Sequence, residues 1–189
     1  MLFTYADYYI PPKTKTTVIM VVEKGEKMYD GELLQELLQK GNNKVLKEIW
    51  ACSNCTERFE KLLSIRDQVD KTAYAMYVRM AIQFDTHRVP LKTLLLVLDG
   101  LTQEDLMTRE ELDKLEEMPE NLTIFRGTDR NEFPPRISWS LSEHKARWFY
   151  QGQMYKALIN KQDIYAYFCS NGTEEEIIAH ITNNFDEIL

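Results

Sequence analysis

The sequence predicts an α+β fold in which a helical N-terminal part precedes a compact mixed or antiparallel β core. Apolar residues between positions 30 and 118 recur with the 3.6-residue period of helices. After Pro119 the pattern changes to short β-type runs separated by turns. We therefore expect a strand and helices over residues 1–118 and a β core over residues 119–189, which together form one globular unit.

The N-terminal part begins with a run typical of a strand. Six of the eight residues at 16–23 are β-branched. Asp30 is a suitable N-cap for the first expected helix, and Gly100 would end a later one. Thr108 and Glu111 have the spacing of a capping box, which would start the last helix before Pro119 ends it. Helices are expected over residues 30–40, 45–50, 57–84, 91–98 and 109–118.

The β core is expected to hold several short strands and one helix. Ser142 can cap a helix that reaches residue 150, and Gly152 would stop it. Residues 161–168 are interpreted as a short helix or turn. Strands are expected over residues 122–126, 136–140, 155–159 and 174–181.

Charge and hydropathy exclude several functional classes. The net charge is -7 and the isoelectric point is about 5.1, which argues against a protein that coats nucleic acid, because such affinity comes mainly from Lys and Arg. The longest apolar runs, at 18–22 and 94–98, are far shorter than the roughly 20 residues of a membrane span. The first residues also lack the features of a signal peptide. We expect a cytoplasmic protein with neither a membrane nor a nucleic acid as its partner.

The three cysteines favour reduced thiols. Cys52 and Cys55 form a single C-x-x-C pair, and Cys169 stands alone. A structural zinc site needs four ligands, and the three histidines are too far apart in sequence to complete one. No strand clearly leads into the pair, so a redox motif is not indicated either. No metal is expected.

The β core contains three short polar motifs whose side chains could bind a ligand. The first contains an arginine and the second contains two serines. Arg126 ends an expected strand, and its planar guanidinium could clamp a phosphate or carboxylate while Gly127 lets a ligand approach the backbone. Ser138 and Ser140 would share one face of the next strand, where they could position a carboxylate or a ribose. Each motif also has a simpler interpretation, as an ordinary turn and as serines preceding a helix.

The third motif is a pair of glutamates. Glu174 and Glu176 would share a face of the strand expected at 174–181, which continues into apolar residues. Charge at the edge of a buried strand costs free energy unless a partner or a ligand uses it. A solvated acidic turn is the alternative interpretation.

Taken in order, these motifs resemble the R-S-E class of the ADP-ribosyltransferase family, especially its compact bacterial and phage members. The family carries an arginine on a first core strand, Ser-x-Ser on a later strand and Glu-x-Glu on a strand beyond that. The resemblance covers about residues 122–181 and implies a β core of ADP-ribosyltransferase type. Because this stretch is short for such a core, some strands are either missing or supplied by the N-terminal part. Trp139 stands where the family often has threonine. The matching residues are Arg126, Ser138 with Ser140, and Glu174 with Glu176.

The resemblance implies that NAD is the substrate. Glu176 would be the catalytic carboxylate that hydrogen-bonds the 2'-hydroxyl of the ribose, and Ser138 would hold Glu176 and this ribose in place. Arg126 would bind the phosphates of NAD, and Gly127 and Ser140 would complete the NAD-binding site. A carboxylate placed beneath the sugar stabilises the positive charge that develops there as the bond to nicotinamide breaks.

In the family, a glutamate at the position of Glu174 accompanies modification of arginine side chains. Glu174 would orient and help deprotonate the acceptor, whose high pKa makes it a poor nucleophile. The expected partner is a protein, and similarity to phage and bacterial members implies a bacterial host protein. Two alternatives remain open: an NAD glycohydrolase, in which water replaces the acceptor, and a binding protein that keeps the fold without catalysis.

Overall fold

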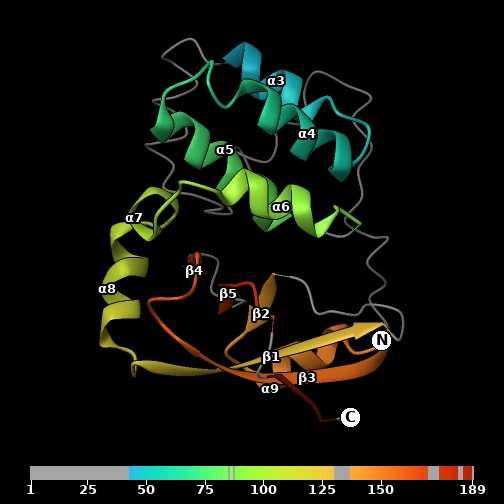
Figure 1. Ribbon diagram of the computed structural model, residues 1–189, viewed down its shortest axis with the longest axis vertical. Helices are drawn as coiled ribbons and strands as arrows, with labels where there is room; N and C mark the ends of the chain where they lie inside the picture. Colours follow the sequence, from blue (N-terminus) through green and yellow to red (C-terminus); the bar gives the residue numbers. More distant parts are fainter. Residues whose placement is uncertain are drawn as a thin grey trace, which may run out of the picture.

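The computed structural model describes residues 43–84, 86, 88–129, 137–169, 175–182 and 185–188. It is an α+β structure in which N-terminal helices precede a six-stranded antiparallel sheet. Most of the N-terminal helices lie on one side of the sheet and the last of them runs along its flank, with the short strands between the helices and the two long strands (Figure 1). The expected strand at 16–23 and the expected helix at 30–40 lie outside the described residues. The described helices of this part are α3 (Asn43–Trp50), α4 (Cys55–Ile65), α5 (Lys71–Phe84), α6 (Leu91–Leu98), α7 (Gln103–Leu106) and α8 (Arg109–Glu117).

The prediction of one long helix at 57–84 is wrong, because two helices occupy this stretch. Helix α4 ends at Ile65 and α5 starts at Lys71. Asp70 begins the second helix, since its Oδ1 accepts a hydrogen bond from the Ala73 amide at 2.9 Å. Apolar residues recur on both sides of the break, so periodicity alone did not reveal it. The short α7 was also missed.

The predicted ends of α6 and α8 are confirmed. Gly100 follows α6 with φ +74°, a conformation that favours glycine. At the start of α8, the Glu111 amide donates to Thr108 Oγ1 at 3.3 Å, and the Thr108 amide donates to Glu111 Oε2 at 2.8 Å. Both hydrogen bonds of the expected capping box are therefore formed.

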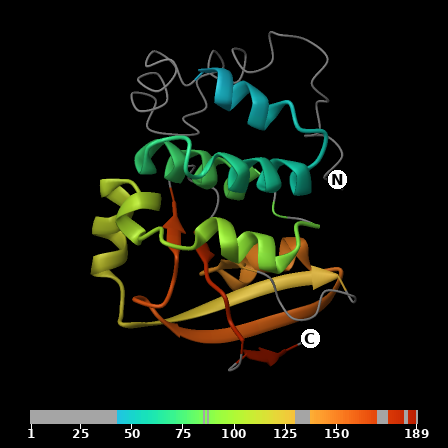
Figure 2. The same ribbon diagram turned by 45° about the horizontal axis from the view of Figure 1, so that its top comes forward.

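The sheet consists of two halves that meet at one residue pair. Its strand order is β4-β5-β2-β1-β3-β6, with antiparallel neighbours throughout. Phe125–Ser140 is the ladder pair between β1 and β2 in the described part of the chain. The strands β4 and β5 run across the direction of β1 and β3 (Figure 2). The strands are β1 (Asn121–Asp129), β2 (Ser138–Ser140), β3 (Gly152–Asn160), β4 (Ala166–Phe168), β5 (Glu176–Ile178) and β6 (Phe185–Glu187).

Three expectations for the β core are corrected. Residues 166–168 form strand β4 and not a helix or turn; this strand is buried on both faces and so shows no alternation. The helix capped by Ser142 is only α9 (Glu143–Ala146), continued by the 3₁₀ turn η2 (Arg147–Phe149), and Gly152 belongs to β3. The last strand in the sequence is the mostly exposed β6, whereas the strand expected at 174–181 was predicted to be the last.

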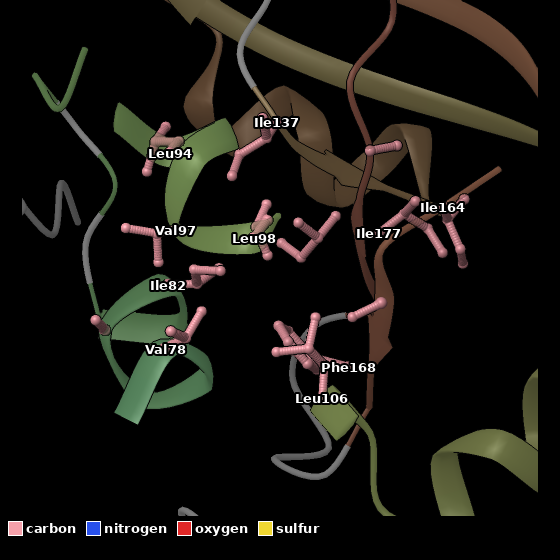
Figure 3. Packing of buried hydrophobic residues seen from close by; sticks show 14 of the residues in the cluster. Val78, Ile82, Leu94, Val97, Leu98, Leu106, Ile137, Ile164, Phe168 and Ile177 are labelled. Atoms are coloured by element: carbon pink, nitrogen blue, oxygen red, sulfur yellow. The ribbon is translucent and has the colours of Figure 1, made fainter. Parts of the chain in front are cut away.

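One apolar core joins the helices to the short strands. Side chains of α5 and α6 lie close to β2, β4 and β5, and Leu106 of α7 lies near Phe168 (Figure 3). None of the helices in the described ranges is long and apolar enough to cross a membrane. The core residues seen in this view include Val78, Ile82, Leu94, Val97, Leu98, Ile137, Ile164 and Ile177.

Candidate active site

Three of the motif residues are linked through hydrogen bonds across neighbouring strands. Arg126 lies on β1, Ser138 on β2 and Glu176 on β5. The Arg126 Nη1 donates to the Ser138 carbonyl oxygen. The Ser138 hydroxyl donates to Glu176 Oε1 at 2.5 Å. Residues 50 positions apart in the sequence therefore meet where the two halves of the sheet join.

The register explains why the serine reaches the glutamate. In an antiparallel sheet, directly paired residues project from the same face. Ser140 pairs with Glu176 and Ser138 pairs with Ile178, so both serines share the face of the carboxylate. The Ser138–Glu176 contact is the diagonal one, which side chains two residues apart can span.

The four motif residues on β1, β2 and β5 are only partly buried. Arg126, Ser138, Ser140 and Glu176 are all half-buried. Beside them, Trp139 projects from the opposite face of β2 and is 2% exposed. Apolar Trp139 thus backs β2 on one face, and the half-buried polar residues lie on the other, where the Arg126 Nε is itself buried. Such a mixture is typical of sites where a few polar groups orient a bound molecule.

Ser140 has a local contact as well as its place beside Glu176. Its Oγ accepts a hydrogen bond from the Ser142 amide at 3.1 Å. Ser142 in turn caps α9, because its Oγ accepts from the Lys145 amide at 3.3 Å. The Ser140 hydroxyl therefore stabilises the turn after β2 in the absence of any ligand.

Gly127 lies under the helix that follows the serine motif. A Cβ atom at this position would be 2.2 Å from the Ala146 carbonyl oxygen and 2.7 Å from the Tyr150 amide nitrogen. These are backbone atoms, so no side-chain movement could relieve the overlap. Close packing against α9 and η2 accounts for the glycine without any ligand.

The acidic motif is described in part. Glu174 lies outside the described residues. Glu175 is exposed, and its carbonyl oxygen accepts a hydrogen bond from the Leu141 amide at 3.0 Å. Glu176 is therefore the acidic residue of this segment whose carboxylate is seen to contact the serine motif.

A second polar cluster was not identified from the sequence. Arg79 of α5 and Glu111 of α8 form a bidentate ion pair, with Nη1–Oε2 at 2.6 Å and Nη2–Oε1 at 2.8 Å. Both side chains are buried, at 6% and 1% exposure. The sequence predicts for Glu111 only its part in the capping box. The signal for a second role is Arg79, a charged residue within the mostly apolar α5.

The environment of Glu111 favours its ionised form. Burial alone would raise the pKa of this carboxyl. The hydrogen bonds and charge of Arg79, with the amides of Thr108 and Cys169, outweigh that effect and leave the pKa below its usual value. Glu111 is therefore a charged group within the core.

Other features in the described part of the chain give weaker support for a functional site. Cys52, Cys55 and Cys169 form no disulfide, and burial raises the pKa of Cys52. No group of three or more His, Cys, Asp or Glu residues within the described ranges is arranged to hold a metal ion. A hollow of about 420 Å³ lies between residues 101–104 and 162–165, and none of the motif residues lines it.

Comparison with protein-family models, with curated proteins and with solved structures finds no match to this chain. The hydrogen-bonded arrangement of Arg126, Ser138 and Glu176 is therefore the basis of the functional proposal that follows.

Proposed function

We propose that the protein is a mono-ADP-ribosyltransferase that transfers ADP-ribose from NAD to an arginine side chain of a protein and releases nicotinamide. The hydrogen bond of 2.5 Å from the Ser138 hydroxyl to the Glu176 carboxylate carries this proposal. It is the contact that the R-S-E resemblance requires between residues 38 positions apart. A solvated acidic turn, the simpler interpretation of the glutamates, does not require such a contact.

The three linked residues suit the chemistry of nicotinamide release. The bond between ribose C1' and the nicotinamide nitrogen breaks with its electron pair leaving on nicotinamide, so positive charge develops on the sugar. The Glu176 carboxylate would stabilise that charge and hydrogen-bond the ribose 2'-hydroxyl. Ser138 fixes the direction of the carboxylate in advance. Arg126 would bind a phosphate of NAD with its planar guanidinium.

The transfer step completes the reaction. A guanidinium nitrogen of the target would form the new bond to C1', and the proton that it loses would pass to a carboxylate. We assign this proton transfer to Glu174, on the basis of the family resemblance. The β core would then be of ADP-ribosyltransferase type, and a bacterial host protein would be the target of a cytoplasmic, phage or bacterial effector.

The experiment is an incubation of the purified chain with labelled NAD, with and without a bacterial lysate. Nicotinamide release and label on proteins are both measured. Glu176→Gln is the test variant, because it keeps an oxygen that can accept from Ser138 but removes the charge. Glu175→Gln is the matched control, since it makes the same change at the neighbouring exposed position.

The outcomes separate the candidates. Label that appears on a lysate protein, is lost in Glu176→Gln and persists in Glu175→Gln supports the transferase and identifies its target. Nicotinamide release without protein labelling supports an NAD glycohydrolase. Absence of both activities in the wild-type chain contradicts the proposal and leaves a non-catalytic binding protein as the alternative to pursue.

A further inference from the structure

The ion pair between Arg79 and Glu111 is in contact with the strand that borders the candidate site. The Cys169 amide, directly after β4, donates to Glu111 Oε1 at 3.2 Å. The Arg79 guanidinium lies over the Phe168 ring, with Cζ 4.6 Å from the ring centroid. Arg79 Nη1 also donates to the Leu106 carbonyl oxygen at 2.7 Å. The pair therefore holds the end of β4 between α5 and α8.

Phe168, the residue held by this pair, is the direct neighbour of Glu176. Phe168 and Glu176 are paired across β4 and β5, and Glu176 is paired with Ser140 on its other side. Each of the strands β2, β4 and β5 has only three residues. A strand this short makes few ladder hydrogen bonds of its own, so its position depends on the elements that fix its neighbours.

Stability by itself does not account for a buried ion pair at this place. The cost of removing two charges from water can equal or exceed their attraction, and apolar residues of similar volume are often as stabilising. Phe168 also packs in an apolar region near Leu106, where such residues would fit (Figure 3). What an apolar pair could not supply is the acceptor for the Cys169 amide and the fixed direction of the guanidinium over Phe168.

We propose that Arg79 and Glu111 are positioning residues for the reaction, which hold β4 so that β5 presents the Glu176 carboxylate to Ser138. This inference rests on the proposed function and extends it to the helical part of the chain. The helical part then has a role in catalysis through the placement of β5, although neither residue contacts the substrate.

The test compares three forms of the full chain. The variant Arg79→Met/Glu111→Leu replaces the pair by apolar residues, and Arg109→Met/Asp113→Leu makes the same change at an exposed ion pair of α8, in which Arg109 Nε and Asp113 Oδ1 are 2.9 Å apart. Folding is measured by circular dichroism, amide exchange by mass spectrometry, and nicotinamide release by kcat and KM for NAD.

We expect the variant that lacks the buried pair to stay folded, with amides of β4 and β5 exchanging at least tenfold faster. Its kcat should fall about tenfold or more while KM for NAD stays within about twofold. The exposed-pair variant should match the wild type. If the buried-pair variant fails to fold, Glu111→Gln is tested in its place, because the amide keeps one oxygen acceptor. We expect this variant to fold fully and its kcat to fall by less than tenfold.

Two results would overturn the inference. One is wild-type exchange in β4 and β5 together with wild-type kcat. The other is a loss of activity that only equals the loss of folded protein, since this would assign the pair a purely structural role. A wild-type chain that releases no nicotinamide would instead contradict the proposed function, and the exchange of the β5 amides would still decide whether the pair holds this strand.

Discussion

Glu111 in the helical part and Glu176 in the sheet differ in how deeply the two residues are buried. Glu111 is 0% exposed and accepts hydrogen bonds on both oxygens, from Arg79, Thr108 and Cys169. Glu176 is half-buried, and its contact with Ser138 is a hydrogen bond from a neutral hydroxyl. One carboxylate is enclosed in the core beside a full positive charge, and the other belongs to a half-buried residue and is oriented by a hydroxyl.

This difference indicates which carboxylate can take part in chemistry. A buried and paired charge gains most of its stabilisation within the folded chain, so its loss is felt in folding. A half-exposed carboxylate with a fixed direction can stabilise charge that develops on a bound molecule, so its loss is felt in turnover. The two regions therefore predict opposite consequences for the same kind of substitution.

The largest expected effect is on stability, from Glu111→Leu. Because Arg79 would be left buried without its partner carboxylate, the free energy of unfolding should fall by about 3 to 5 kcal/mol. Urea denaturation measures this change. Glu110→Leu, at an exposed position of the same helix, should shift it by about 0.5 kcal/mol or less. A loss below about 1 kcal/mol for Glu111→Leu would show that the pair is not essential to the fold.

Glu176→Gln should leave stability nearly unchanged and reduce turnover about a hundredfold, which corresponds to about 2.7 kcal/mol of transition-state stabilisation. The amide retains the oxygen that accepts from Ser138, so folding has little to lose. Denaturation and nicotinamide release are measured on the same preparation. Destabilisation without a specific fall in kcat would show that Glu176 serves the fold and not the reaction.

Gly127→Ala tests the packing under the serine motif. Its Cβ would overlap the Ala146 carbonyl oxygen, so we expect a loss of about 1 to 3 kcal/mol in the free energy of unfolding. Thr123→Ala, at an exposed position of the same strand, should cost less than about 1 kcal/mol. Equal stability of the two variants would contradict the close approach of α9 to β1.

Ser138→Ala should lower turnover about tenfold, because the Glu176 carboxylate loses the hydroxyl that fixes its direction. Ser138→Thr keeps the hydroxyl and should recover most of the activity. Steady-state kinetics with NAD provides the measurement. Equal activity of the alanine and threonine variants would show that the hydrogen bond is not used.

The smallest effect concerns the pH dependence of folding. The pKa of Glu111 is lower in the folded chain than its usual value near 4.5, so its contribution to stability is complete above that pH and is lost as the pH falls towards the folded value. The difference in unfolding free energy between the wild type and Glu111→Gln should therefore be constant from pH 7 to 5 and shrink below about 4.5. A difference that grows as the pH falls would contradict the direction of this pKa shift.

Local signals predicted the helical part better than the sheet. The capping box of Thr108 and Glu111 and the stop at Gly100 depend on neighbours within four residues, and both are confirmed. The break between α4 and α5 was missed because the apolar pattern continues across Asp70. The three-residue β4 was missed because a short buried strand has no alternation, and β6 was missed because its exposed acidic residues do not resemble a strand.

The polar residues likewise differ in whether local sequence features predict them. The residue types and order of Arg126, Ser138 and Glu176 could be read from the sequence, because side-chain types and their spacings are local features. The prediction that Arg126 ends its strand is wrong, because β1 continues to Asp129. The Arg79–Glu111 pair could not, because its members are 32 positions apart and meet only when α5 and α8 pack together. At the level of sequence, the capping box accounts for Glu111, and nothing in its neighbourhood indicates a second role.

By itself, the sequence determined the α+β class, the ends of α6 and α8 and the identity of the polar residues, since these follow from periodicity, capping and side-chain chemistry within short segments. The tertiary structure alone decided the strand order β4-β5-β2-β1-β3-β6, and it supplied the register that brings Ser138 to Glu176, a contact that the resemblance had implied without its geometry. It also decided the enclosure of Glu111 by donors from three segments. Contacts between distant residues depend on how the whole chain packs, and no local pattern encodes that packing.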